Sequence, residues 1–416
     1  MSFASAYIEK NTLFPQFIDE KPDANTGIIV VIPSYSEPSI NLVIDSLAQA
    51  EKPECNVEVI VVVNAPQGAS LHSLEQNRKT LNYIESLKQN DKNIWFRLFS
   101  LDIELGIMPE WGVGLARKTG MDEALRRFCI INNPFGIIVS LDADCKVEKN
   151  YFTAISNHFY KRKNLNACSI YFEHDISGNE FSESEYKNIL QYELHIRYFL
   201  QGLKFTGYPW AFNTIGSAMA VRAKQYALQG GMNRRQAGED FYFIQKMISG
   251  GGYFSLNTTA VYPSSRTSLR VPFGTGVVMA KLCENAGSQF MTYNPAAFSD
   301  LRSLFNMSDL LYDCRDNNYN AIPESVKIYV DKNEWELKIA EIRENTANAE
   351  AFKKRFFNWF NMFKIVRYLN TAHQELFCKI PVIQAAADFL QSMPIEYTGN
   401  SPEDLLNYYR ALERGN

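Results

Sequence analysis

Apolar segments that end in polar residues constrain the fold of this chain more than any other sequence feature. Four short runs rich in Val, Ile, Leu and Phe lie within the first 144 residues, at 27–33, 57–64, 94–101 and 135–144. Nearly unbroken apolar runs of this length are typical of strands that are covered on both faces, as in parallel sheets. The sequence therefore predicts a buried sheet at the start of the chain.

Helix-like segments separate these strands. Residues 36–50 and 73–89 have helical patterning, and residues 112–128 look like a glycine turn followed by a helix. Alternation of strand and helix predicts a doubly wound α/β sheet. Ligands of such sheets bind at the carboxyl ends of the strands, so we expect the functional residues there.

The rest of the chain predicts a second region. We expect a strand at 212–222, a helix from 238 and a strand from 253, and then mostly helices beyond about residue 300. A chain of 416 residues is long for a single core. We predict an N-terminal extension at 1–26, a sheet domain at 27–275, and a mostly helical C-terminal region at 276–416.

Composition narrows the classes of protein. The chain is 46% hydrophobic and 21% charged, which is typical of a folded soluble protein. The net charge is -4 and no block of Lys and Arg occurs, so nucleic acid and an anionic membrane are not expected partners. Seven scattered cysteines without a CxxC pair argue against a zinc site or a disulfide framework and favour the cytoplasm. We expect no signal peptide and no transmembrane segment, although peripheral contact with a membrane remains open.

Two aspartates end the fourth apolar run. Asp142 and Asp144 are two residues apart, so in an extended segment their side chains point the same way. Carboxylates this close repel each other unless a cation lies between them, and Mg²⁺ or Mn²⁺ prefers oxygen ligands. The hypothesis is a divalent ion that holds a diphosphate. The alternative is a turn in which the carboxylates cap backbone amides.

Other candidate residues also follow predicted strands or begin a helix. Tyr35 could stack on a nucleotide base or simply pack, and Asn64 could pair with a base edge or with its own backbone. Glu239 and Asp240 could supply a general base, or could only interact with the dipole of the helix they begin. Trp210 could stack on a sugar or lie in a core.

Cations could neutralise a leaving diphosphate. Arg117 and Lys118 follow the glycine turn, and Arg266 and Arg270 lie in a late polar loop. For Lys118 and Arg270 we expect the more ordinary place, a solvated surface.

The order of these motifs resembles the family 2 glycosyltransferases of the GT-A fold, over roughly residues 27–275. The resemblance implies a mixed, mostly parallel sheet and transfer of a sugar from a nucleotide-diphosphate donor to an acceptor hydroxyl, with inversion. It also implies a divalent metal, Mn²⁺ or Mg²⁺, bound by Asp144 and Asp142. The base would be Asp240 or, as second choice, Glu239.

The resemblance and the residue chemistry together give the remaining site predictions. Candidate contacts of the nucleotide sugar are Pro33, Ser34, Tyr35, Glu37, Asn64, Arg117, Asp142 and Arg266. Candidates on the acceptor side are Trp210, Gly216 and Ser217.

Departures from the family pattern bear on the substrate. Asn64 stands where the family usually has an aspartate, which favours a uridine nucleotide. The QxxRW signature of processive polysaccharide synthases is absent, so a synthase of that type is not expected. Three alternatives remain. One is a non-catalytic protein that binds sugar nucleotides, and another is a retaining transferase. The third is a sugar-1-phosphate nucleotidylyltransferase, which "IPSYSEP" disfavours because it lacks that class's glycine-rich loop.

Overall fold

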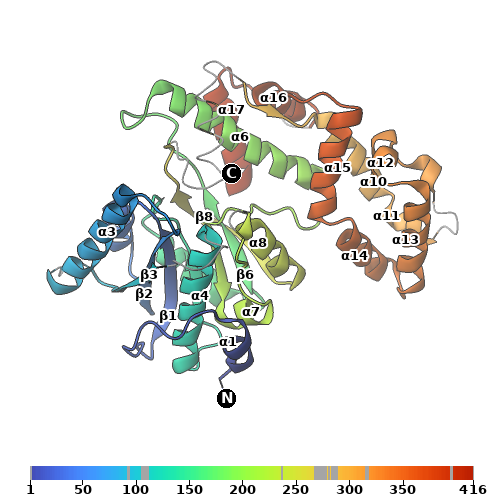
Figure 1. Cartoon of the computed structure of the whole chain (residues 1–416). Coiled ribbons are helices and arrows are strands. Elements are labelled where there is room, and N and C mark those ends of the chain that lie inside the picture. Colours follow the sequence, from blue (N-terminus) through green and yellow to red (C-terminus); the bar gives the residue numbers. More distant parts are fainter. Residues whose placement is uncertain are drawn as a thin grey trace. The chain divides into compact units, whose positions relative to one another are not determined.

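The computed structural model describes residues 2–90, 94–104, 112–235, 238–266, 279, 282, 289–313, 318–393 and 397–415. The chain divides into two compact units (Figure 1). Unit 1 comprises Met1–Tyr186, Thr214–Glu284 and Glu413–Asn416, and unit 2 comprises Lys187–Asn213 and Asn285–Leu412. The three domains expected from the sequence, at 1–26, 27–275 and 276–416, stay predictions.

Unit 1 is built on an eight-stranded sheet within the described part of the chain. Its strand order is β3-β2-β1-β4-β7-β6-β8-β5. The strands are β1 (Thr26–Ser34), β2 (Asn56–Ala65), β3 (Arg97–Glu104), β4 (Ile137–Ser140), β5 (Lys146–Val147), β6 (Ala167–Phe172), β7 (Met219–Arg222) and β8 (Tyr253–Tyr262).

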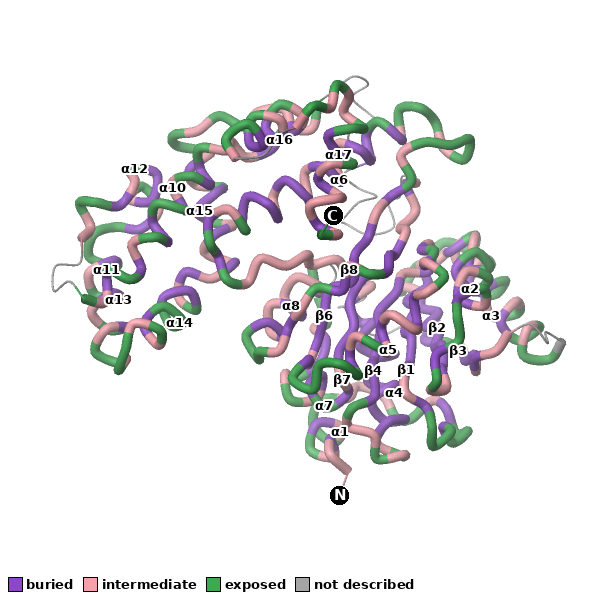
Figure 2. The backbone as a smooth tube through the Cα atoms, turned by 180° about the vertical axis from the view of Figure 1, so that it is seen from behind, coloured by how far each residue is buried: buried purple, intermediate pink, exposed green. Residues whose placement is uncertain are grey.

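The sheet is mixed and mostly parallel. β3, β2, β1 and β4 run parallel, as do β6 and β8, whereas β7 is antiparallel to both of its neighbours. The four apolar runs of the sequence form the parallel half, and Ile28 to Ile32 of β1 are completely buried. Figure 2 shows β1, β2 and β4 largely as buried backbone, whereas β3 lies at the edge of the sheet. The predicted α/β class is therefore confirmed.

Helices cover the sheet of unit 1. They are α1 (Ser5–Asn11), α2 (Ile40–Gln49), α3 (Leu71–Asn90), α4 (Val113–Ile130), α5 (Tyr151–Lys161), α7 (Ala223–Leu228) and α8 (Glu239–Ser249). The chain moves outward from β1 to β3 and then returns to β4, beside β1. Because crossovers between parallel strands are right-handed, α2 and α3 cover one face and α4 covers the other.

Helix α4 lies close against the sheet (Figure 1). A Cβ atom added at Gly120 would lie 2.4 Å from Val31 and 2.7 Å from Val62. Only glycine therefore allows this approach of the helix to β1 and β2. The close packing fixes the first turns of α4, which carry Arg117, at the carboxyl edge of the strands.

The N-terminal segment packs on the other side of α4. Tyr7 Oη donates a hydrogen bond to Asp122 Oδ1 at 2.8 Å and accepts one from Lys118 Nζ at 2.9 Å. The backbone amides of Phe17 and Ile18 donate to the carboxylate of Glu123. Lys118 is 3% exposed, so the expectation of a solvated surface was wrong for this residue. Its charge is satisfied by Asp122, 3.0 Å away.

Unit 2 is mainly helical, as predicted for the C-terminal region. Together with α6, which starts in unit 1, it contains α6 (Glu183–Phe205), β9 (Met291–Thr292), α10 (Pro295–Asn306), α11 (Ser308–Asp313), η1 (Tyr319–Ala321), α12 (Glu324–Tyr329), α13 (Lys332–Glu344), α14 (Ala349–Trp359), α15 (Met362–Glu375), β10 (Ile380–Pro381), α16 (Val382–Gln391) and α17 (Pro402–Arg414). Its core is rich in aromatic residues, such as the fully buried Trp335 against Phe356. Among the described helices of both units, none has the length and apolar character to cross a membrane.

Candidate active site

The candidate site lies where the strand order of the sheet reverses. β1 and β4 are neighbours although β2 and β3 lie between them in the sequence. In doubly wound sheets, this switch point opens a crevice at the carboxyl ends of the two strands. Val31 is opposite Ser140, and the amide of Leu141 still donates to Val31 O at 3.1 Å. The "PSYSEP" and "DAD" segments therefore leave the sheet side by side.

Arg117 joins the first aspartate to the acidic pair of α8. Its Nη2 donates to Asp142 Oδ1, and its Nη1 donates to Glu239 Oε1. Arg117 is 3% exposed and Glu239 is 2% exposed. The arginine is therefore a buried link between two acids.

Two glycines make room for this link. A Cβ at Gly216 would lie 2.7 Å from Nη1 of Arg117, and a Cβ at Gly114 would lie 3.0 Å from Cβ of Glu239. Gly216 and Ser217 lie in a turn, because the strand predicted at 212–222 begins only at Met219. The assignment of these two residues to a strand was therefore wrong. The turn lets the backbone of Gly216 touch the guanidinium.

Asp240 lies beside the link and is more accessible than Glu239. It is half-buried at the start of α8, which follows Gly238 at a φ of 70°. Its carboxylate accepts a hydrogen bond from the amide of Phe241 at 2.7 Å, and the backbone of Gly216 lies nearby. Burial raises the pKa of Asp240, and it raises the pKa of Glu239 to about 7 against the opposing effect of Arg117. Both acids therefore hold a proton at a higher pH than a solvated carboxyl does.

Arg266 joins the second aspartate to the "PSYSEP" loop. It makes a two-pronged ion pair with Glu37, in which Nη1 lies 2.9 Å from Oε1, and its Nη2 also lies 3.1 Å from Asp144 Oδ2. Glu37 is 2% exposed and also accepts the amide of Ser39 at 2.9 Å. Each aspartate of "DAD" is thus bonded to an arginine that is held by a buried glutamate.

Asn77 is a site residue that sequence reasoning missed. Its side chain on α3 accepts from the amide of Ser36 at 2.8 Å and donates to the carbonyl of Asn64 at 2.9 Å. Ser36 has a φ of 48°, so the loop needs this support in a strained conformation. An asparagine among the polar positions of a helix carries no sequence signal for such a role. Asn77 fixes the two strand ends that carry Tyr35 and Asn64.

The structure brings most of the predicted residues together. Ser217 lies near Cys145, the neighbour of Asp144. Pro33 and Ser34 end β1, and Tyr35 follows them. Trp210 belongs to unit 2, where its ring contacts Tyr208 at 5.8 Å. Arg270 lies outside the described residues.

The charges of this site fit a divalent cation. Five carboxylates, from Glu37, Asp142, Asp144, Glu239 and Asp240, surround two guanidinium groups, from Arg117 and Arg266. When all are ionised, negative charges exceed positive ones by three, so a diphosphate needs a further cation to enter. Within the described residues, no cluster of three or more His, Cys, Asp or Glu forms a complete metal site. Mg²⁺ and Mn²⁺ commonly need only one or two carboxylates plus substrate phosphates, which Asp142 and Asp144 can supply.

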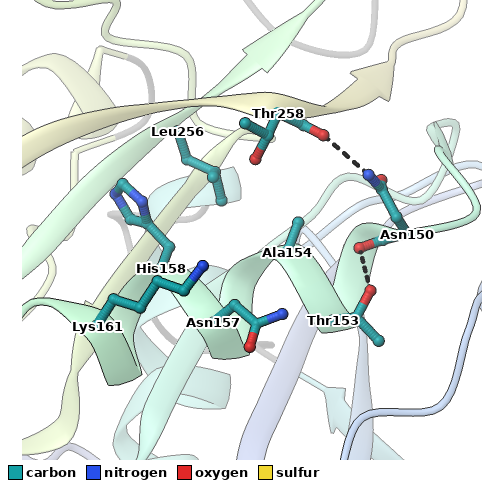
Figure 3. A pocket seen from close by; sticks show the side chains of 8 residues that line it. All are labelled: Asn150, Thr153, Ala154, Asn157, His158, Lys161, Leu256 and Thr258. Atoms are coloured by element: carbon teal, nitrogen blue, oxygen red, sulfur yellow. Dashed lines mark hydrogen bonds between the residues drawn. The ribbon is translucent and has the colours of Figure 1, made fainter.

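A separate groove of about 330 Å³ lies between α5 and β8 (Figure 3). It is lined by Asn150, Thr153, Ala154, Asn157, His158, Lys161, Leu256 and Thr258. The side chain of Asn150 donates to the carbonyl of Thr258 across it at 2.9 Å. None of the candidate site residues lines this groove, so it is distinct from the candidate site.

Comparison with known proteins finds similarity only among solved structures. No model of a known protein family matches the sequence, and no curated protein matches it. A structure of TarS from S. aureus is similar at 14% identity and a TM-score of 0.39, over 84% of this chain and 55% of that chain. TarS 1-349 in complex with UDP-GlcNAc is similar at 16% identity and a TM-score of 0.41, over 84% of this chain and 90% of that chain. Mannosyltransferase PcManGT from Pyrobaculum calidifontis, in complex with GDP-Man and Mn²⁺, is similar at 13% identity and a TM-score of 0.36, over 93% of this chain and 92% of that chain.

Proposed function

We propose that the protein is a glycosyltransferase that uses a nucleotide-diphosphate sugar and a divalent metal. The observation that carries the proposal is the bonding of Arg117 to both Asp142 and Glu239 at the switch point of the sheet. It supports a site in which a metal-binding pair and a base pair share one arginine. A site that only bound a nucleotide would need no buried acid pair with raised pKa values.

The nucleotide end of the donor would lie at β1 and β2. In this proposal Tyr35 stacks on the base and Asn64 contacts the base edge, with Asn77 holding both segments in place. Pro33 and Ser34 end β1 just before Tyr35 and Glu37, and in this proposal they lie beside the nucleotide. An amide at position 64 can accept from N3–H of uracil, which favours a UDP-sugar.

Asp240 is the proposed base, and Glu239 is the less suitable candidate. Glu239 is nearly inaccessible and is bonded to Arg117, whereas Asp240 is only partly buried. Asp240 takes the proton of the acceptor hydroxyl while the oxygen of that hydroxyl forms a bond to the anomeric carbon. The bond from that carbon to the diphosphate breaks on the opposite face, so the configuration is inverted. When bound at Asp142 and Asp144, a divalent cation offsets the charge that develops on the leaving diphosphate.

The acceptor side would be formed by the turn of Gly216 and Ser217, because Gly216 lies near both Asp240 and Arg117. Trp210 belongs to unit 2, and its assignment to the acceptor side stays a prediction from the sequence. Neither residue type selects one acceptor class, so the proposal names only a hydroxyl.

The test measures the melting temperature of the protein with UDP, GDP, CMP or dTDP, each with and without Mn²⁺, because a ligand that binds the folded state raises it. We expect stabilisation by UDP that requires Mn²⁺ and is lost in Asp144→Asn. Asp45→Asn, on the exposed face of α2, is the matched control. Failure of every nucleotide to stabilise the protein would contradict the proposal. Nucleotide binding without transfer or donor hydrolysis would favour a non-catalytic sugar-nucleotide-binding protein.

A further inference from the structure

Arg266 donates a hydrogen bond to an oxygen of Asp144 that would also bind the proposed metal. Its Nη2 lies 3.1 Å from Oδ2 of Asp144, while Nη1 and the same Nη2 both donate to the carboxylate of Glu37. A divalent cation binds a carboxylate oxygen at about 2 Å. The cation and the guanidinium would then lie side by side on one carboxylate, and two positive charges at such a separation repel each other.

We propose that Arg266 sets the affinity of Asp144 for a divalent cation, because guanidinium and metal compete for this carboxylate. Metal binding releases Arg266 from Asp144 and leaves it on Glu37. The inference rests on the proposed function, since it concerns the metal of that same site. It adds a residue that determines how much metal the site requires.

The backbone at this position is anchored, so the competition needs only a side-chain movement. Ser265 is 1% exposed and its hydroxyl donates to the carbonyl of Asp175 at 2.8 Å. The amide of Arg266 donates to Ser264 Oγ at 3.3 Å. These bonds hold the chain up to residue 266 while the guanidinium turns.

Release from Asp144 leaves Arg266 with a full partner. Both prongs of the Glu37 carboxylate remain bonded, and the amide of Ser39 keeps that carboxylate in place. The Nε–H of Arg266 is buried and makes no hydrogen bond to the described residues. An unpaired buried donor destabilises the present position of the side chain, which favours its release.

The two arginines of the site differ in this respect. The side chain of Arg117 is 4% exposed and bonds to the buried Glu239, whereas that of Arg266 is 20% exposed. Moving Arg117 would leave Glu239 as an uncompensated buried charge, which is strongly unfavourable. Asp144 is therefore the aspartate whose arginine can be displaced.

The experiment measures the dissociation constant of Mn²⁺ directly, from the electron paramagnetic resonance of free Mn²⁺, with and without UDP. It compares the wild type, Arg266→Gln, Lys146→Gln and Asp144→Asn. Lys146 is exposed and two residues from Asp144, so its removal controls for a general loss of positive charge. We expect Arg266→Gln to bind Mn²⁺ at least about threefold more tightly than the wild type. Lys146→Gln should change the affinity less.

The outcomes separate this inference from the proposed function. If Asp144→Asn abolishes Mn²⁺ binding but Arg266→Gln binds it no more tightly than the wild type or Lys146→Gln, competition is refuted and the metal site stands. If neither wild type nor Arg266→Gln binds Mn²⁺, both proposals fail. Should Arg266→Gln not fold, Arg266→Lys replaces it. Lysine keeps the charge but cannot grip two carboxylates, so an unchanged affinity would again refute competition.

Discussion

Asp142 and Glu239 accept hydrogen bonds from the same guanidinium, that of Arg117. One acid follows β4 and the other begins α8, so two distant parts of the sequence share a single buried charge. If either acid moves, Arg117 moves with it, and the hydrogen bond that Arg117 donates to the other acid changes. The proposed metal pair and the proposed base pair are therefore coupled through one side chain.

Asp240→Asn removes the proposed base without changing the size of the side chain. We expect the rate of sugar transfer, or of donor hydrolysis in its place, to fall by about 10²–10⁴-fold. The affinity for UDP with Mn²⁺ should stay unchanged, because the base acts on the acceptor. Asp45→Asn should leave both quantities as in the wild type, and near-normal turnover in Asp240→Asn would refute the assignment.

Gly216→Ala places a methyl group against Arg117. The added Cβ would lie 2.7 Å from Nη1 of the guanidinium, so the arginine must leave Asp142 or Glu239. Overpacking of this kind costs roughly 1–3 kcal/mol of unfolding free energy, and we expect lower Mn²⁺ affinity as well. Ser217→Ala, one residue further along the turn, is the control. Equal stability and metal affinity of the two variants would contradict the tight fit.

Stability should depend on pH through Glu239. Burial raises its pKa to about 7, above the value of roughly 4.3 for an unfolded glutamate. Between these two pKa values the folded state keeps a proton that the unfolded state has lost. Protonation of Glu239 therefore contributes stability that is fully present below about pH 4 and is lost as the pH rises toward 7. Relative to the wild type, the melting temperature of Glu239→Gln should rise across this interval.

The control for the pH series is Glu54→Gln, an exposed glutamate of the same unit. Its melting temperature should differ from that of the wild type by a nearly constant amount between pH 4 and pH 8. A constant difference for Glu239→Gln as well would show that the pKa of Glu239 is not raised by folding.

Asn77→Ala should weaken nucleotide binding through the loop it supports. The variant loses bonds to the amide of Ser36 and the carbonyl of Asn64, and each buried group left unpaired costs about 1–3 kcal/mol. We expect weaker UDP binding and less discrimination between UDP and GDP, measured by calorimetry. Asn82→Ala, exposed on the same helix, is the control. Unchanged discrimination would leave Asn77 with a purely structural role.

Tyr7→Phe should destabilise unit 1 far from the crevice. The hydroxyl of Tyr7 donates to the buried Asp122 and accepts from the buried Lys118, so its loss leaves both with fewer partners. We expect a loss of about 1–3 kcal/mol in chemical denaturation. Tyr160→Phe is the matched control because Tyr160 is 86% exposed. Equal effects of the two substitutions would refute a structural role for the N-terminal segment.

The sequence was sufficient to predict the parallel half of the sheet, because unbroken apolar runs and intervening helices have few other arrangements. It also placed Asp142 and Asp144 at a strand end. The partners of these acids were beyond its reach. Arg266 and Glu37 are 229 residues apart, and only the folded sheet brings them together. Lys118 was misplaced because a helix pattern shows polar positions but not the segment that covers them.

The contacts between the N-terminal segment and α4 also set an order of folding. Tyr7 meets Asp122 across 115 residues, and Ile18 meets Glu123 across 105. Contacts at such separations close large loops of chain, so we expect them to form after the local turns and helices. Synthesis proceeds from the N-terminus, and the segment waits without its partners until α4 has been made. The part of unit 1 that leaves the ribosome first is thus held in place by a helix that is made about a hundred residues later.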